Sequence, residues 1–191
     1  MMLDLLRKAS KVLSYLFRPF IIGWNSISFF VRYLLAGRSN AFSYLSRVGK
    51  ESIIPIMRLM GAQIGSNCDI ETGIVFHNCH DLRKLRIGND VHIGKQCFFD
   101  LREEIHISSN VVVSMKCTFI THMELTQSNL SHQYPASSGK IQIGQHSYIG
   151  SGSTVLMNVI IGSEVVVAAN TLLIRSVESK SKVKGIPGKQ F

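Results

Sequence analysis

One histidine, His122, stands where a regular run of apolar residues ends and a polar stretch of the chain begins. An imidazole has an unperturbed pKa of about 6.5, so it can accept a proton at neutral pH and serve as a general base. By position alone, His122 is more simply a solvated side chain at a loop boundary. Asp100 and Arg102 occupy the matching place one repeat earlier, where polar residues usually cap turns.

The remaining histidines and the cysteines indicate neither a metal site nor disulfide bonds. No CxxC pair occurs, and Cys68, Cys97 and Cys117 fall at apolar positions of the repeat. We expect them to be small core residues in a reducing compartment. No zinc-ligand spacing connects the other histidines, which are His77, His80, His92, His106, His132 and His146. We therefore expect no metal.

An apolar residue recurs every six positions between Ile64 and Leu173, and glycine often follows it directly. This period fits neither a helix nor a simple strand. It predicts a solenoid in which each hexapeptide forms a short strand and a turn, and three hexapeptides close one triangular coil. The small residue after each leader is expected to permit a tight corner. The fifteen leaders form five sets of three: Ile64, Ile70, Phe76; Ile87, Ile93, Phe99; Ile107, Val113, Phe119; Ile143, Ile149, Val155; Ile161, Val167, Leu173.

The repeat is interrupted after Phe76, Phe99 and Phe119, which should themselves stack as an aromatic ladder along one corner. The longest interruption, residues 123–140, is rich in Ser, Gln, Asn, Pro and Gly, as exposed loops are. Long loops on a rigid scaffold often carry binding and catalytic residues. The sequence therefore directs attention to the start of this loop.

The N-terminal part of the chain carries most of the positive charge. Residues 1–60 contain nine Lys/Arg and two Asp/Glu, which is +7 of the total +9. Residues 3–18 predict an amphipathic helix that Pro19 should end or kink. The next apolar stretch has a charge-free run of thirteen residues, whereas a membrane span needs about twenty.

Two interpretations of this basic, aromatic segment stay open. Residues 1–35 could lie on an anionic membrane surface, or the segment could cap the open end of the solenoid. No groove-reading motif indicates nucleic acid, and no secretory signal is evident. We therefore expect a helical segment over residues 1–58, a repeat domain over residues 59–191, and a cytoplasmic location that allows peripheral attachment at the inner membrane face.

Three stretches resemble the hexapeptide-repeat acyltransferases over roughly residues 59–191, most closely the O-acetyltransferases of maltose, galactosides and exopolysaccharide biosynthesis. They are Thr121-His122, the stretch from Tyr148-Ile149-Gly150-Ser151-Gly152 to Thr171, and Lys184-Gly185-Ile186-Pro187-Gly188-Lys189. The resemblance implies an all-β fold. This is a left-handed parallel β-helix of about five triangular coils, with a helical N-terminal segment and a long loop inserted after the third coil.

The resemblance also implies an activity: acetyl-CoA-dependent O-acetylation of a sugar hydroxyl in a surface polysaccharide or its precursor. In such enzymes the histidine before the loop is the general base, which places that role on His122. Asp100 and Arg102 become candidate contacts for the sugar. The family's shared groove implies a homotrimer. Contacts with acetyl-CoA carry over to Ser151, Ala169, Arg175 and Lys189.

The chain departs from the family where maltose-type enzymes place an asparagine shortly before the histidine: Ser114-Met115-Lys116-Cys117 contains none. The sequence therefore does not identify the residues that bind the acceptor. A nucleotide-sugar N-acyltransferase and a non-catalytic trimeric scaffold are the alternative functions. The three-histidine zinc set of γ-class carbonic anhydrases is missing, as are the acidic helical domain and paired-glycine loop of serine O-acetyltransferases.

Overall fold

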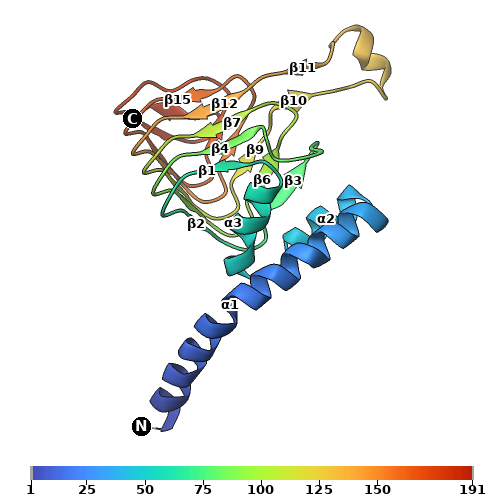
Figure 1. Ribbon diagram of the computed structural model, residues 1–191. Coiled ribbons are helices and arrows are strands. Elements are labelled where there is room, and N and C mark those ends of the chain that lie inside the picture. Colours follow the sequence, from blue (N-terminus) through green and yellow to red (C-terminus); the bar gives the residue numbers. More distant parts are fainter. Residues whose placement is uncertain (1, 191) are drawn as a thin grey trace.

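The chain folds as a parallel β-helix preceded by helices, as Figure 1 shows. The computed structural model describes residues 2–190, and the side chains of residue 13 and residues 15–190. The helices are α1 (Met2–Leu35), α2 (Arg38–Leu45) and α3 (Lys50–Leu59), and all the strands follow them. The predicted β-helix fold is confirmed.

Three parallel sheets form the faces of the solenoid, and each strand pairs with its counterparts in the neighbouring coils. Sheet I contains β1 (Gln63–Ile64), β4 (Leu85–Ile87), β7 (Ile105–Ile107), β12 (Ile141–Ile143) and β15 (Ile160–Ile161). Sheet II contains β2 (Asp69–Ile70), β5 (His92–Ile93), β8 (Val112–Val113), β13 (Tyr148–Ile149), β16 (Val166–Val167), β18 (Lys182–Lys184) and the antiparallel β19 (Lys189–Gln190). Sheet III contains β3 (Val75–His77), β6 (Phe98–Asp100), β9 (Thr118–Phe119), β14 (Thr154–Val155) and β17 (Leu172–Leu173).

The solenoid continues for a partial turn beyond the five predicted coils. In the described residues, β18 pairs with β16 in parallel, and Val177 forms an isolated parallel bridge with Ile161. Val177 and Val183 stand six positions apart, so they continue the hexapeptide period after a shortened connection. The side chain of Val183 is buried, and it extends the core to the C-terminal end.

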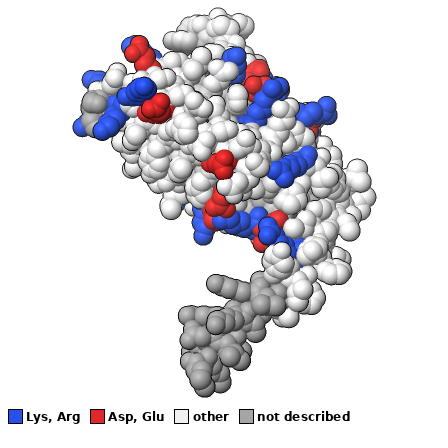
Figure 2. All heavy atoms as spheres, turned by 60° about the vertical axis from the view of Figure 1, so that its left-hand side comes forward, with Lys and Arg blue, Asp and Glu red and all other residues white. Residues whose placement is uncertain are grey.

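The helices close the N-terminal end of the solenoid. Phe29, Phe42, Ile53 and Ile56 are buried and join the same core as the strands. Helix α1 continues through Pro19 and does not end there. Figure 2 shows basic and acidic side chains interspersed over the solenoid, and an uncharged surface beside the grey N-terminal atoms. No helix in the described residues is long and apolar enough to cross a membrane.

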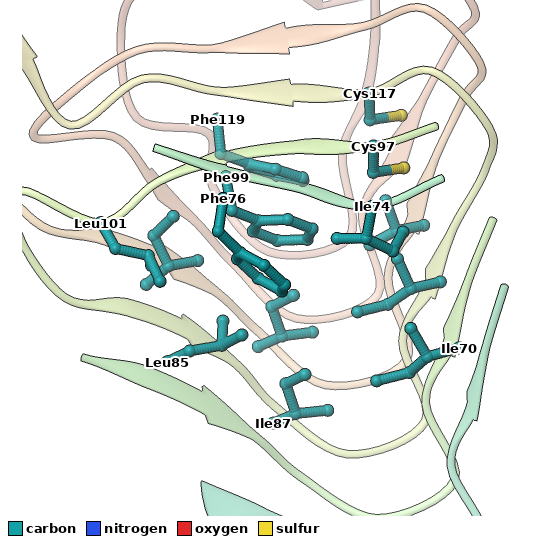
Figure 3. Packing of buried hydrophobic residues seen from close by; sticks show 14 of the residues in the cluster. Ile70, Ile74, Phe76, Leu85, Ile87, Cys97, Phe99, Leu101, Cys117 and Phe119 are labelled. Carbon is teal, nitrogen blue, oxygen red and sulfur yellow. The ribbon is translucent and has the colours of Figure 1, made fainter. Parts of the chain in front are cut away.

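The predicted aromatic ladder is present, and it reaches into the helical cap. The ring centroids of Phe119 and Phe99 lie 4.9 Å apart, and those of Phe99 and Phe76 lie 5.9 Å apart (Figure 3). Phe76 then meets Phe42 of α2 at 6.0 Å, and Phe42 meets Phe29 of α1 at 5.8 Å. Each such pair contributes about 0.5–1.5 kcal/mol beyond its buried area, so the ladder ties the helices to the first coils.

The sequence predicted that the glycines after the leaders permit the turns. In the structure they instead allow neighbouring coils to pack closely. A Cβ on Gly150 would lie 2.5 Å from the backbone nitrogen of Ala169 in the next coil. The left-handed backbone conformation occurs two positions after such glycines, as at Gln96 (φ 59°), which follows Gly94. The glycine is therefore required by the short distance between stacked backbones.

The insertion after the third coil is a projecting arm and not an irregular loop. Strand β10 (His122–Met123) pairs antiparallel with β11 (Ser137–Ser138), and the 3-10 helix η1 (Asn129–His132) lies near the tip. In Figure 1 the arm extends away from the solenoid on the side where α2 lies. His122 is thus the first residue of a strand, opposite Ser138.

Candidate active site

His122 and Asp100 form the centre of the candidate site. Asp100 ends β6 and is paired with His77 of β3, while His122 follows β9 one coil later. Nδ1 of His122 lies 2.6 Å from Oδ2 of Asp100. The side chain of Asp100 is 2% exposed and that of His122 is 19% exposed, so the carboxylate is buried and the imidazole stays partly accessible.

Hydrogen-bond donors surround the Asp100 carboxylate. The backbone N–H of Thr121 donates to Oδ2 at 2.8 Å, and the Thr121 hydroxyl donates to it at 2.9 Å. Nδ2 of Asn78 donates to Oδ1 at 3.2 Å, and the backbone N–H of Arg102 lies 3.4 Å from the same oxygen. Burial raises the pKa of Asp100, but the hydrogen bonds from His122, Thr121 and Asn78 together hold it below its ordinary value.

The ionised carboxylate determines which nitrogen of His122 carries the proton. A carboxylate can only accept hydrogen bonds, so Nδ1 must donate its hydrogen to Asp100. Neutral imidazole has one N–H and one acceptor nitrogen, which leaves Nε2 as the acceptor. This is the tautomer that a general base needs, because Nε2 carries no proton.

The amide of Asn78 lies over the imidazole ring and does not block Nε2. Its Nδ2 is 3.1 Å from Nε2 and 3.5 Å from Nδ1 of His122. A donor in the ring plane, on the lone-pair axis of Nε2, would be much farther from Nδ1 than from Nε2. The similar distances therefore place the amide against the ring face, and the lone pair of Nε2 stays available to a substrate hydroxyl.

The base of the arm is held to the same corner of the solenoid. The backbone N–H of Glu103 donates to the Thr121 hydroxyl at 3.1 Å, and the hydroxyl of Ser138 donates to the Glu103 carboxylate at 2.9 Å. Arg102 forms an ion pair with Glu124 of the arm at 2.5 Å. These contacts attach both strands of the arm, next to His122, to residues 102 and 103 of the solenoid.

A cavity of about 570 Å³ borders this centre, between α2 and the loop that follows β3. Asn78 and Arg102 line it, and both also contact the Asp100 carboxylate, through the Asn78 amide and the Arg102 backbone N–H. Arg102, a predicted sugar contact, therefore lies at the cavity. Asp100, the other predicted sugar contact, is buried, and its oxygens face His122, Thr121 and Asn78 instead.

The predicted acetyl-CoA contacts lie elsewhere on the chain. Ser151 and Ala169 follow β13 and β16 at the same corner of successive coils, and the Ser151 hydroxyl shares a hydrogen bond of 2.6 Å with that of Ser114. Arg175 follows β17 and is exposed, as is Lys189 in β19.

Sequence reasoning missed Asn78, although a signal was available. His77 pairs in register with Asp100, and Phe99 pairs with Phe119, so Asn78 and His122 follow the same sheet in different coils. Polar residues at this corner of three coils were the indication. No asparagine stands just before His122 along the chain, and the asparagine beside its ring comes from the first coil. Within the described residues, no group of three or more His, Cys, Asp or Glu side chains is placed to hold a metal.

Comparisons with known proteins agree with the repeat and the fold. A family profile described as "Hexapeptide repeat of succinyl-transferase" matches residues 46–76 and 140–175. A curated protein of Bacillus subtilis, "Putative acetyltransferase YvoF", is 32% identical over 103 residues. That match covers 50% of this chain and 56% of the relative, so the chain spans little more than half of the relative's length.

Two solved structures share the fold. A maltose O-acetyltransferase from Clostridium difficile has a TM-score of 0.66 and 19% identity, covering 78% of this chain and 82% of its own. The N-acyltransferase AntD from Bacillus cereus, in complex with dTDP and 3-hydroxybutyryl-CoA, has a TM-score of 0.58 and 20% identity, covering 69% and 71%. The profile, the relative and the shared fold confirm the predicted resemblance: this chain carries hexapeptide repeats and folds as a β-helix like these two solved structures.

Proposed function

We propose that the protein is an acetyl-CoA-dependent O-acetyltransferase that acts on a sugar hydroxyl of a surface polysaccharide or its precursor. The observation that carries this proposal is the 2.6 Å contact between Nδ1 of His122 and the buried carboxylate of Asp100. It orients the imidazole and leaves Nε2 as the base. The likeness to a putative acetyltransferase and a maltose O-acetyltransferase supports the same chemistry.

The reaction needs one proton acceptor and no covalent enzyme intermediate. Nε2 of His122 removes the proton of the sugar hydroxyl as its oxygen attacks the thioester carbon of acetyl-CoA. The tetrahedral intermediate collapses with cleavage of the carbon–sulfur bond, and the CoA thiolate takes the proton back from the imidazolium. Asp100 is a positioning residue whose negative charge stabilises that imidazolium. The products are the sugar acetate ester and CoA.

We assign the donor site to Ser151, Ala169, Arg175 and Lys189. Small residues at the corner after β13 and β16 allow the pantetheine arm to approach the backbone, and the exposed cations can meet the CoA phosphates. A homotrimer would complete this groove from two chains. This assignment rests on the resemblance to enzymes that bind CoA thioesters between subunits.

We further propose that α1 attaches the protein to an anionic membrane surface, at the inner face for a cytoplasmic enzyme. Most of the exposed apolar side chains of α1 recur at spacings of three and four and so form one stripe along the helix. Its members are Leu13, Leu16, Phe17, Phe20, Trp24, Ile27, Val31 and Leu34. Arg18 and Arg32 lie on the same helix and can pair with lipid phosphates.

The alternative functions make different predictions for the acceptor and the donor. A nucleotide-sugar N-acyltransferase would use the same base on a sugar amine, and the likeness to AntD supports that reading. A non-catalytic trimeric scaffold would bind no CoA thioester at all. The proposed O-acetyltransferase must bind acetyl-CoA and release CoA only with a hydroxyl acceptor.

Calorimetric titration with acetyl-CoA, followed by a CoA-release assay over a panel of neutral, phosphorylated and amino sugars, tests the proposal. We expect micromolar binding that weakens in Lys189→Ala and persists in His122→Ala, while His122→Ala loses transfer to hydroxyl acceptors. His132→Ala, which removes an exposed histidine from the arm, is the matched control and should keep both properties. Transfer only to amines would establish the N-acyltransferase, and no binding by folded protein would leave the scaffold.

A further inference from the structure

The cavity beside His122 is built jointly by the helical segment and the first coil. Arg38 and Phe42 of α2 form one wall, and His77, Asn78 and His80 form the opposite wall. The Phe42 ring packs against Phe76 at 6.0 Å, and this contact fixes the distance between the walls. The Tyr33 hydroxyl of α1 donates to the backbone carbonyl of His80 at 2.9 Å. The cavity is therefore a fixed feature of the chain.

The lining of the cavity is positively charged. Arg38 and Arg102 both contribute to it, and no Asp or Glu is among its lining residues. Arg102 already pairs with Glu124. Among the described side chains, Arg38 forms no ion pair with a carboxylate, and its guanidinium instead contacts Nδ1 of His80. A guanidinium stays charged at all physiological pH values, so Arg38 can take an anionic partner from a ligand.

The number of hydrogen-bond donors indicates which anion fits. Besides Arg38, the residues Ser39 and Ser43 on α2 and His77 on the opposite wall line the same space, and each has a side-chain group that can donate a hydrogen bond. A carboxylate offers two oxygens, whereas a phosphate ester offers three and a diphosphate more. Arginine also binds phosphate oxygens in a bidentate way. Donors from both walls are therefore better matched by a phosphate or diphosphate than by a carboxylate.

The cavity also has the place and size for an acceptor. Asn78 lines it and its amide lies 3.1 Å from Nε2 of His122, so this one side chain connects the cavity to the base, which itself lies just beyond the lining. Cavities that bind small molecules usually have volumes of about 300–1,000 Å³. The volume of this cavity, about 570 Å³, lies within that range. A sugar with its phosphate group is a ligand of this size.

We propose that this cavity binds the acceptor as a phosphorylated sugar, with the phosphate or diphosphate at Arg38 and the sugar directed toward His122. The inference rests on the proposed function, because it names the substrate class of the same site. The diphosphate could belong to a nucleotide sugar or to a lipid-linked sugar. The shared chemistry is the phosphate, and the two sources are separated by experiment.

Calorimetric binding with matched probes tests the inference. Methyl glucoside, glucose 1-phosphate and UDP-glucose would be titrated into the full-length protein, together with a short-chain polyprenyl diphosphate-linked N-acetylglucosamine in detergent. We expect the phosphorylated probes to bind at least about tenfold more tightly than methyl glucoside. Arg38→Gln should remove about tenfold or more of that affinity, as expected for one lost charge-assisted contact. A preference between the last two probes identifies the source.

Two control variants make the result specific. Arg83→Gln removes an arginine whose side chain is 79% exposed and which does not line the cavity, so it should bind every probe like the wild type. His122→Ala should keep phosphate binding while losing acetyl transfer. Equal affinity for neutral and phosphorylated probes, or unchanged affinity in Arg38→Gln, would overturn the cavity assignment. Failure of every variant and the wild type to bind acetyl-CoA would instead contradict the proposed function.

Discussion

The carboxylate of Asp100 lies 2.6 Å from Nδ1 of His122, although 22 positions separate the two residues along the chain. Asp100 ends a strand of sheet III, and His122 begins the arm that leaves the next coil of the same sheet. The stacking of coils therefore creates the pair. Because the carboxylate is buried and accepts hydrogen bonds from Thr121 and Asn78, its orientation toward the imidazole is fixed.

Asp100→Asn should lower kcat for acetyl transfer by about 10²–10⁴-fold, which is the contribution of a positioned general base. The amide of the variant can donate a hydrogen bond to Nδ1, which favours the tautomer whose proton is on Nε2. In that tautomer Nε2 cannot act as the base. The affinity for acetyl-CoA should not change. Kinetics of CoA release beside calorimetric titration check both statements. A variant that kept its kcat would show that Asp100 has only a structural role.

The stability of the protein should fall in acid partly through Asp100. Its pKa in the folded protein is lowered by the hydrogen bonds from His122, Thr121 and Asn78, against the effect of burial. A carboxyl group with a depressed folded pKa stabilises the native state above its unfolded pKa, and this contribution is lost as the pH falls through the folded value. The difference in the free energy of unfolding between wild type and Asp100→Asn should therefore shrink below about pH 4. Urea unfolding at a series of pH values measures it, and a constant difference would contradict the prediction.

Gly150→Ala should destabilise the solenoid, because its Cβ would lie 2.5 Å from the backbone nitrogen of Ala169. Backbone cannot move aside as a flexible side chain can, so we expect a loss of about 1–3 kcal/mol or more. Gly23→Ala in α1 is the matched control, since nothing lies within 4 Å of its added Cβ. It should be neutral or stabilising by up to about 1 kcal/mol. Thermal and urea unfolding of both variants check the contrast.

Replacing Phe20, Trp24 and Ile27 by serine should release the protein from vesicles that contain anionic lipid. These side chains are 75%, 71% and 62% exposed, so the fold should survive the change while the apolar stripe is lost. Flotation with liposomes measures the bound fraction. Three helices on one trimer would add avidity and sharpen the effect.

Phe29→Ala is the control for that experiment. Phe29 lies on the same helix but is fully buried against Phe42, so its removal should cost about 3–5 kcal/mol of stability without removing the stripe. For the same reason, deletion of residues 1–35 would remove part of the core together with the stripe. Unchanged flotation of the triple variant would leave only the capping role for α1.

The hexapeptide period by itself determined the architecture. Every coil repeats the same pattern of an apolar leader followed by a small residue. This pattern alone predicts that equivalent leaders share one face, as these do in the structure: Ile87, Ile107, Ile143 and Ile161. The ladder of Phe76, Phe99 and Phe119 followed from the same rule. The partial sixth turn was missed because Val177 and Val183 follow a connection of irregular length.

The candidate site depended on contacts that no local rule supplies. The position of His122 before the arm was visible in the sequence, and so was Asp100, but their pairing requires two coils to stack after insertions of different lengths. Asn78 enters from a third coil, and Arg38 enters from a helix packed on the end of the solenoid. A repeat determines which side chains point inward, because that depends on neighbours along the chain. Only the tertiary structure decided which corner residues meet, because that depends on how the interruptions between coils are accommodated.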